Sequence, residues 1–176
     1  SIPKAVEDAL HGELERELTR IRRSKDNDLD LNAFKHEFYL TRIEPILDKG
    51  RGACWLRKPR IARMMMEALE YYDGDRYRLY AYVVMGNHVH VVFKLFRGAD
   101  LGPLLRDWKG YTSKQAKQIL NREENTFWQP EYYDRLIRTV GEFRRTVQYT
   151  WYNPEAAGFE SWDSRRRFLD RMGDVL

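Results

Sequence analysis

The sequence is poor in cysteine and has no long apolar run. Cys54 is the one cysteine among 176 residues, which excludes an internal disulfide and a multi-cysteine zinc site. No stretch approaches the roughly 18 consecutive apolar residues of a membrane helix, and the N-terminus lacks the basic start and apolar core of a signal peptide. The GxxxxGK[ST] pattern of a P-loop is also missing. These absences predict a cytoplasmic protein with no membrane partner and no P-loop nucleotide site.

Hydrophobic residues make up 43% and aromatic residues 14% of the chain, which is typical of a folded domain and not of a disordered one. The charge is uneven: residues 51–122 carry 14 basic and six acidic side chains, whereas 1–50 and 123–176 each have a net charge of −2. A bound polyanion would account for the basic middle, although a solvated helical surface is an equally good explanation. The candidate phosphate contacts there are Arg57, Lys58, Arg60, Arg63, Arg76, Arg78, Lys94, Arg97, Lys109, Lys114 and Lys117.

Two histidines stand one residue apart in the apolar run LYAYVVMGNHVHVVFKL, residues 79–95. Because side chains alternate along a strand, His88 and His90 should emerge on the same side, with α-carbons about 7 Å apart. That spacing suits two metal ligands, but it also suits two polar residues on the solvated face of a half-buried strand.

A second informative segment is EFRRTVQYTWYNPEAAG, residues 142–158, which has helical periodicity and a proline that should end the helix at Asn153. Tyr149 and Asn153 are four residues apart, so they share one face of that helix. If this face lies against the histidines, the site combines two imidazoles, an amide oxygen as third ligand and a phenol capable of covalent catalysis. Tyr152 is the nearest rival for the nucleophile, but it has no amide four residues further on.

In these features the chain resembles the REP-associated tyrosine transposases, within the single-tyrosine HUH superfamily of DNA-strand transferases. The matching blocks are GACWLRKPRIARMMMEAL at 52–69, RYRLYAYVVMGNHVHVVF at 76–93, FWQPEYYDRLIR at 127–138 and QYTWYNPEAAG at 148–158. HUH denotes His, a hydrophobic residue and His, which here is His88-Val89-His90. The resemblance implies that Tyr149 is the nucleophile and that Asn153 joins the two histidines as a metal ligand.

The resemblance also implies the reaction and the substrate. Tyr149 would form a 5′-phosphotyrosine on single-stranded DNA that carries a hairpin of the repetitive extragenic palindromic type. A hard divalent ion, Mg²⁺ or Mn²⁺, would assist. Trp128, Gln129, Arg135 and Arg138 are candidate recognition residues. Packing into the core is the alternative, and among the four it is strongest for Trp128. The working form would be a monomer or a homodimer.

The chain departs from the family pattern at two places. Gly86 stands where members usually carry a proline, which loosens the turn before the first histidine and should have a small effect. Relatives usually have an additional strand ahead of the first helix, and the printed sequence begins at Ser1 without one. We expect either that the numbering omits residues of the natural protein or that the sheet lacks an edge strand.

Two other functions fit the same residues. A catalytically inactive or domesticated DNA-binding or regulatory module would follow if the absent strand disables the site. A replication-initiator or relaxase-type HUH nickase shares the chemistry, but it fits the blocks at 127–138 and 148–158 poorly.

The predicted fold is α+β, with helices packed on a ferredoxin-like antiparallel sheet and an N-terminal two-helix extension. Residues 1–50 would form a helical arm packed on the core, and 51–176 the HUH catalytic domain, as one structural unit overall. Strands are expected at 53–57, 78–85 and 88–95, the last two joined by a Gly86-Asn87 turn. Helices are expected at 3–23, 32–48 with a kink at Pro45, 59–72, 101–120 and 142–153, with a short one at 162–172.

Overall fold

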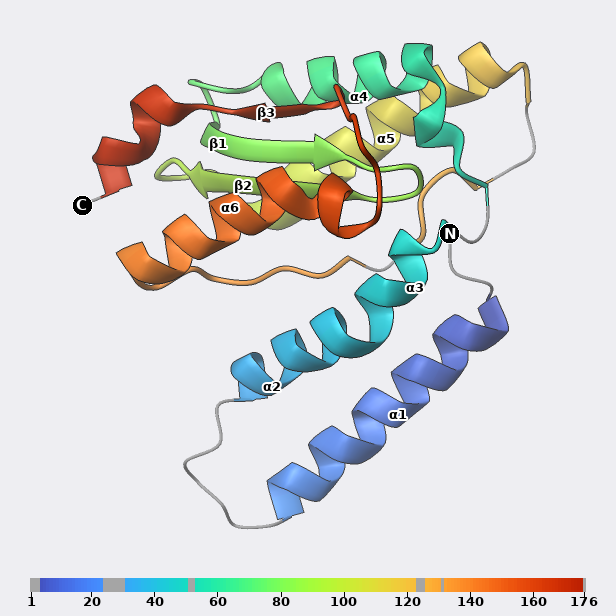
Figure 1. Ribbon diagram of the computed structural model, residues 1–176, viewed down its shortest axis with the longest axis vertical. Helices are drawn as coiled ribbons and strands as arrows, with labels where there is room; N and C mark the ends of the chain where they lie inside the picture. The colour runs from blue at the N-terminus through green and yellow to red at the C-terminus, as the bar shows by residue number, and fades with distance from the viewer. Residues whose placement is uncertain (1–3, 24–30, 51–52, 123–125, 131, 176) are drawn as a thin grey trace. The chain divides into compact units, whose positions relative to one another are not determined.

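The computed structural model describes residues 4–23, 31–50, 53–122, 126–130 and 132–175 (Figure 1). The chain divides into two compact units. The first unit comprises Ser1–Cys54 and Glu131–Leu136, and the second comprises Trp55–Pro130 and Ile137–Leu176. None of the helices in the described part of the chain combines the length and apolar character that a membrane crossing needs.

The first unit is helical. Its elements are α1 (Lys4–Arg23), α2 (Leu31–Phe38), a π-helical turn (Tyr39–Ile43) and α3 (Glu44–Asp48). The helix expected over 32–48 is therefore interrupted by the π turn just before Pro45, because the wider turn makes room for a residue that lacks an N–H and crowds the preceding carbonyls. Gly50, with φ of 63°, follows the end of α3, as is typical of a glycine after a helix. The first residue of the helix expected over 3–23 lies outside the described residues.

The second unit is mixed α+β, which confirms the predicted class of helices packed on an antiparallel sheet. Its strands are β1 (Tyr77–Val84), β2 (Val89–Leu95) and β3 (Arg165–Arg167), in the order β2-β1-β3. Its helices are α4 (Pro59–Glu70), α5 (Leu101–Leu120) and α6 (Val140–Ala156). In Figure 1, α4 and α5 lie on one side of the sheet and α6 lies on the other. Over the described residues β2, the histidine strand, pairs with β1 alone and lies at an edge of the sheet.

The predicted hairpin is present. Gly86 and Asn87 form the bend between β1 and β2, and the Met85 N–H donates to the carbonyl of His88 across it at 2.9 Å. Further from the turn the register shifts by one residue, because Leu79 pairs with Phe93 whereas Ala81 pairs with Val92. Tyr80 is the extra residue, as in a β-bulge. No feature of the sequence predicts this shift.

The shift decides which side chains of β1 meet which helices. Tyr77 and Leu79, before Tyr80, and Tyr82 and Val84, after it, all belong to the cluster that contains the buried residues of α4 and α5. We call this side of the sheet the α4/α5 face. With strict alternation, residues 77 and 79 would point away from 82 and 84.

The opposite side of the sheet, the α6 face, has a separate small core. Tyr80, Ala81 and Val92 pack there with Phe143 and Val147 of α6, and the Tyr80 and Phe143 rings meet edge to face with centroids 4.9 Å apart. Phe143 and Val147, in the first half of α6, thus hold this helix against the sheet.

Residues 53–57, expected as a strand, instead lead into a 3₁₀ helix over Trp55–Arg57. Leu56 is 3% exposed, and its N–H donates to the Gly86 carbonyl at 3.1 Å. The next turn begins α4 at Pro59, with Lys58 extended before it. The apolar character of this segment therefore reflects the burial of Leu56 and not hydrogen bonding between strands.

The helix expected over 162–172 is also wrong. The structure has β3 there, followed by a 3₁₀ helix over Leu169–Val175. β3 pairs antiparallel with β1, and the flanking bonds extend this edge: the Val84 N–H donates to the Ser164 carbonyl at 2.8 Å, and the Phe168 N–H to the Tyr80 carbonyl at 3.0 Å. The open edge of β1 therefore overrides the weak local helical pattern.

Candidate active site

His88 and His90 emerge from the start of β2 toward the α6 face. Val84 pairs with Val89, and both lie on the α4/α5 face. Val83 pairs with His90, so by alternation the His90 side chain lies on the α6 face. Their ring centroids are 4.9 Å apart, with ring planes at 86°. His88 is 9% exposed and His90 is half-buried. Two imidazoles are thus held close together in a sheltered place.

The state of the His88 ring suits metal ligation. Burial and the neighbouring His90 hold its pKa well below the usual value, so the ring is neutral near pH 7. Its Nδ1 lies 2.7 Å from Asn87 Oδ1, and the amide oxygen can only accept, so Nδ1 carries the hydrogen. The lone pair is then on Nε2, the atom that binds metals in many proteins.

α6 is held at its N-terminus by a reciprocal cap. Thr139 is the N-cap residue and its hydroxyl oxygen accepts from the Glu142 N–H at 3.1 Å. Glu142 Oε2 in turn accepts from the Arg138 N–H at 3.0 Å. This resembles a capping box and defines where the helix begins. The helix was expected to end at Asn153, but it continues through Pro154 to Ala156, because a proline in the last turn removes only one helical hydrogen bond.

Tyr149 and Asn153 lie one turn apart on α6, and Asn153 Nδ2 donates to the Tyr149 phenol oxygen across 3.4 Å. Asn153 is 1% exposed, whereas Tyr149 is 39% exposed. The Tyr149 ring meets His90 edge to face, with centroids 5.8 Å apart. The phenol therefore lies beside the imidazole pair with part of its surface open to a substrate.

Tyr152, the rival phenol, is 54% exposed. Among the described residues its ring makes no aromatic contact with either histidine, whereas the Tyr149 ring does. The geometry favours Tyr149 as the phenol that acts beside the imidazoles.

The candidate phosphate contacts differ in what surrounds them. Most of those singled out for DNA binding are exposed: Arg57, Lys58, Arg60, Lys94, Lys114, Arg135 and Arg138. The Arg57 guanidinium lies 5.2 Å from the centre of the Phe159 ring, beyond the end of α6. Its stem runs so close to Gly86 that a Cβ there would be 2.9 Å from Arg57 Nε. Arg57 thus reaches the turn that precedes His88.

Lys109 and Trp128 are tied to protein groups. The Lys109 ammonium donates to the carbonyls of Gln129 and Pro130, at 2.8 and 2.9 Å. The Trp128 indole N–H donates to the Thr112 hydroxyl at 2.7 Å, and its ring borders the core of the α4/α5 face. These contacts fix the segment 127–130 on α5. Arg135 belongs to the first unit and the other candidates to the second.

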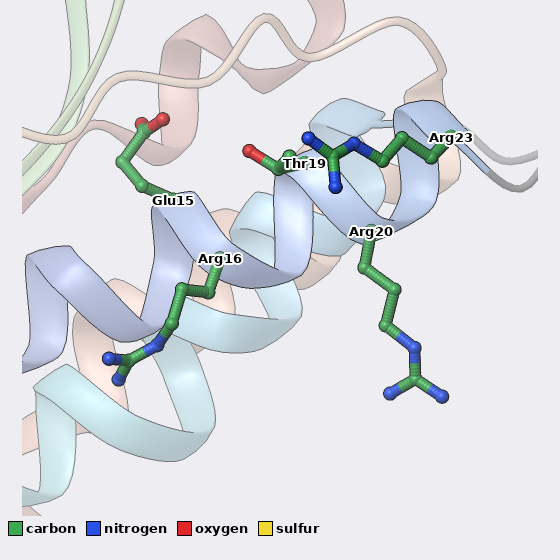
Figure 2. A pocket seen from close by; sticks show the side chains of 5 residues that line it. All are labelled: Glu15, Arg16, Thr19, Arg20 and Arg23. Carbon is green, nitrogen blue, oxygen red and sulfur yellow. The ribbon is translucent and has the colours of Figure 1, made fainter.

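A hollow of about 470 Å³ lies on α1, lined by Glu15, Arg16, Thr19, Arg20 and Arg23 (Figure 2). Arg16 and Arg20 extend away from the side on which Glu15 and Thr19 lie, and Arg23 extends toward Thr19. Because the guanidinium groups do not converge, the hollow has no built anion site.

Sequence reasoning missed the residues that fasten the end of α6 to the sheet. Arg165 of β3 donates to both carboxylate oxygens of Glu155, each at 2.8 Å, and to the Trp151 carbonyl at 2.5 Å. Residues 165–167 are three consecutive arginines, so no alternation of apolar and polar side chains marks a strand there.

Comparison with known proteins identifies relatives over the middle of the chain. A family model described as "Transposase IS200 like" matches residues 54–150, a region that contains His88, His90 and Tyr149. The chain is 26% identical over 99 residues to the REP-associated tyrosine transposase of Escherichia coli (strain K12). The aligned region covers 55% of this chain and 56% of that protein. It therefore spans about half the length of this curated relative. No solved structure matches the chain.

Proposed function

Because the chain belongs to the IS200-like family of single-tyrosine HUH transposases, we propose that it cleaves and transfers single-stranded DNA through a covalent phosphotyrosine. The observation that carries the proposal is the position of the Tyr149 ring, 5.8 Å from His90 and in reach of the Asn153 amide. A phenol, two imidazoles and an amide meet at one place on the α6 face, which supports these roles.

His88, His90 and Asn153 would hold a divalent ion, Mg²⁺ or Mn²⁺. The fit rests on the adjacent imidazoles, the neutral His88 ring and the buried amide on the facing helix. When bound, such an ion polarises the scissile phosphate and stabilises the charge that develops on it.

The reaction itself is an exchange of phosphoesters. The Tyr149 phenol gives up its proton, its oxygen bonds to phosphorus, and the bond from phosphorus to the 3′ oxygen breaks. The products are a 5′-phosphotyrosine and a free 3′-hydroxyl, and the reverse exchange reseals DNA without ATP. Asn153 Nδ2 donates toward the phenol oxygen, which stabilises the phenolate and orients it.

The proposed substrate is hairpin DNA of the REP type with a single-stranded flank, bound by the exposed basic residues of 51–122 and by Arg135 and Arg138. Trp128 and Gln129 would contribute through the segment that Lys109 fixes. We also propose a ferredoxin-like topology for the catalytic domain and a packing role for the arm formed by 1–50. The protein would work as a monomer or homodimer.

The first prediction tests the nucleophile. Labelled single-stranded hairpin DNA is incubated with Mg²⁺ or Mn²⁺ and resolved on a denaturing gel. Wild type and Tyr152→Phe should form a protein–DNA adduct, whereas Tyr149→Phe should form none, because it lacks the attacking oxygen. EDTA should also abolish the adduct.

Other outcomes would decide against the proposal. An adduct that survives in Tyr149→Phe but vanishes in Tyr152→Phe would identify the other phenol. Retarded mobility on a native gel, with no cleavage under either ion, would favour a DNA-binding module without catalysis.

A further inference from the structure

We infer that Arg165 is a positioning residue for the reaction: it clamps the last turns of α6 to the sheet and so fixes Tyr149 and Asn153 beside the histidines. The inference rests on the proposed function for its catalytic consequence. Its structural part stands on contacts within the second unit alone.

The three arginines of β3 alternate between the two faces of the sheet. Arg165 and Arg167 pair with Val83 and Ala81, whose side is the α6 face, whereas Arg166 pairs with Tyr82 on the α4/α5 face. The contacts follow this alternation: Arg165 and Arg167 lie over the Trp151 ring of α6, at 4.3 and 4.8 Å from its centre. Only the outer two arginines can act on α6.

Arg165 makes the most demanding set of contacts. Its guanidinium binds the Glu155 carboxylate through two parallel bonds and the Trp151 carbonyl through a third. The Arg165 side chain is 15% exposed and the Glu155 side chain 44%, so the pair is shielded from water on the arginine side, and its paired geometry adds to its strength. The hydrogen bonds from Arg165 also lower the pKa of Glu155, as expected for a carboxylate held in its charged form.

The clamp is placed where α6 is weakest. Pro154 has no N–H, so the helix loses the bond that would reach the carbonyl of Thr150. Arg165 binds Trp151 and Glu155, the positions two before and two after Asn153. It therefore spans the turn that the proline weakens and that carries the buried amide.

The consequence for catalysis is geometric. Asn153 contacts the Tyr149 phenol oxygen, so a shift of the last turn moves the amide and the phenol together. Displacement of a reacting group by about 1 Å can cost on the order of 100-fold in rate. Because the clamp does not touch the basic residues of 51–122, its loss should slow the chemistry without weakening DNA binding.

The experiment compares Arg165→Gln with Arg166→Gln. Arg166 is a matched control, because it is the next residue of β3 and binds the Glu70 carboxylate on the other face. Two quantities are measured for each: the single-turnover rate of adduct formation at saturating hairpin DNA, and the Kd for that DNA. Arg165→Gln should slow the adduct about tenfold or more with Kd changed less than about twofold, and Arg166→Gln should keep the wild-type rate.

Hydrogen exchange gives a readout that needs no activity. In Arg165→Gln the amides of residues 151–153, 155 and 156 should exchange about tenfold faster, while those of β1 stay protected. Arg166→Gln should leave both sets unchanged. Glu155→Gln, a mild change at a half-exposed carboxylate, should reproduce both effects. Arg165→Lys should restore part of the rate, since an ammonium can bind one carboxylate oxygen.

The results separate the two claims. If wild type forms no Tyr149 adduct, the proposed function is wrong, and the exchange of residues 151–156 alone decides whether the clamp exists. If wild type is active but Arg165→Gln and Glu155→Gln match it in rate and exchange, the clamp is wrong. Equal slowing by Arg166→Gln would also overturn it, because the effect would then be a general loss of sheet stability.

Discussion

Gly86 matters because of what lies against it. The Arg57 stem crosses the glycine, and the guanidinium then reaches the Phe159 ring. The φ of Gly86 is not in the left-handed region, so the position needs a small side chain and not an unusual backbone. The glycine that stands in place of the family's usual proline is therefore the residue against which Arg57 packs.

Gly86→Ala should displace Arg57 without unfolding the protein. The new methyl group would lie 2.9 Å from Arg57 Nε, so the arginine must leave its position. We expect the Kd for hairpin DNA, measured by fluorescence anisotropy, to rise about threefold, as expected for losing one exposed phosphate contact. Arg57→Gln should weaken binding similarly.

The double variant supplies the check. Gly86→Ala combined with Arg57→Gln should bind no worse than Arg57→Gln alone, since both changes remove the same contact. Gly102→Ala, where a Cβ meets open space on α5, is the control. Additive losses would show that Gly86 affects DNA binding by another route.

The spacing of residues within a single strand or helix was enough to predict the main candidate site residues. The alternation of a strand paired His88 with His90, and the turn of a helix paired Tyr149 with Asn153. Arg165 could not be found this way, because its partners Trp151 and Glu155 become neighbours only when β3 joins the sheet. The spacing of residues within one helix or strand cannot reveal contacts that form only when distant segments pair.

At the scale of elements, α6 depends on its cap. Thr139→Ala removes the acceptor for the Glu142 N–H and should lower the free energy of unfolding by about 1 kcal/mol. Urea denaturation at equilibrium measures the loss. Thr139→Ser keeps the hydroxyl and should stay close to wild type. A serine variant as unstable as the alanine variant would show that the methyl group, and not the cap, matters.

Elements with strong internal patterns were predicted well. The helix expected over 101–120 coincides with α5. Its buried side chains, Leu104, Trp108, Thr112 and Ala116, recur every four residues, and Asn121, with φ of 51°, follows its last residue. The hairpin was predicted from a turn signal between two apolar runs. The errors at 53–57 and 162–172 involve short segments, whose structure depends on a contact with β1 or with the Gly86 turn. In such short segments the periodicity of apolar residues is too weak to determine the secondary structure against these contacts.

At the scale of the whole chain, the basic excess of residues 51–122 predicts salt-sensitive DNA binding. Each phosphate contact to single-stranded DNA adds about −0.7 to the slope of log K against log salt concentration. Lys58→Gln with Arg60→Gln removes two exposed charges and should make the slope shallower by about 1.4. Titrations at several salt concentrations measure it.

The control is Arg20→Gln in the first unit, whose side chain is 81% exposed and 3.9 Å from Glu17. It changes the net charge by one, but it lies outside the basic segment, so the slope should stay unchanged. If Arg20→Gln and the double variant shift the slope in proportion to charge alone, binding follows net charge and not a defined surface.

The extra residue at Tyr80 has a consequence for comparisons between relatives. Positions 77 and 79 face the same helices as 82 and 84 because one residue is inserted between them. An alignment that runs a regular strand through β1 without a gap will match the half nearest the histidines correctly and assign the other half to the wrong side. Substitutions at 77 and 79 would then be judged as if they faced α6, although these two positions fill the opposite core.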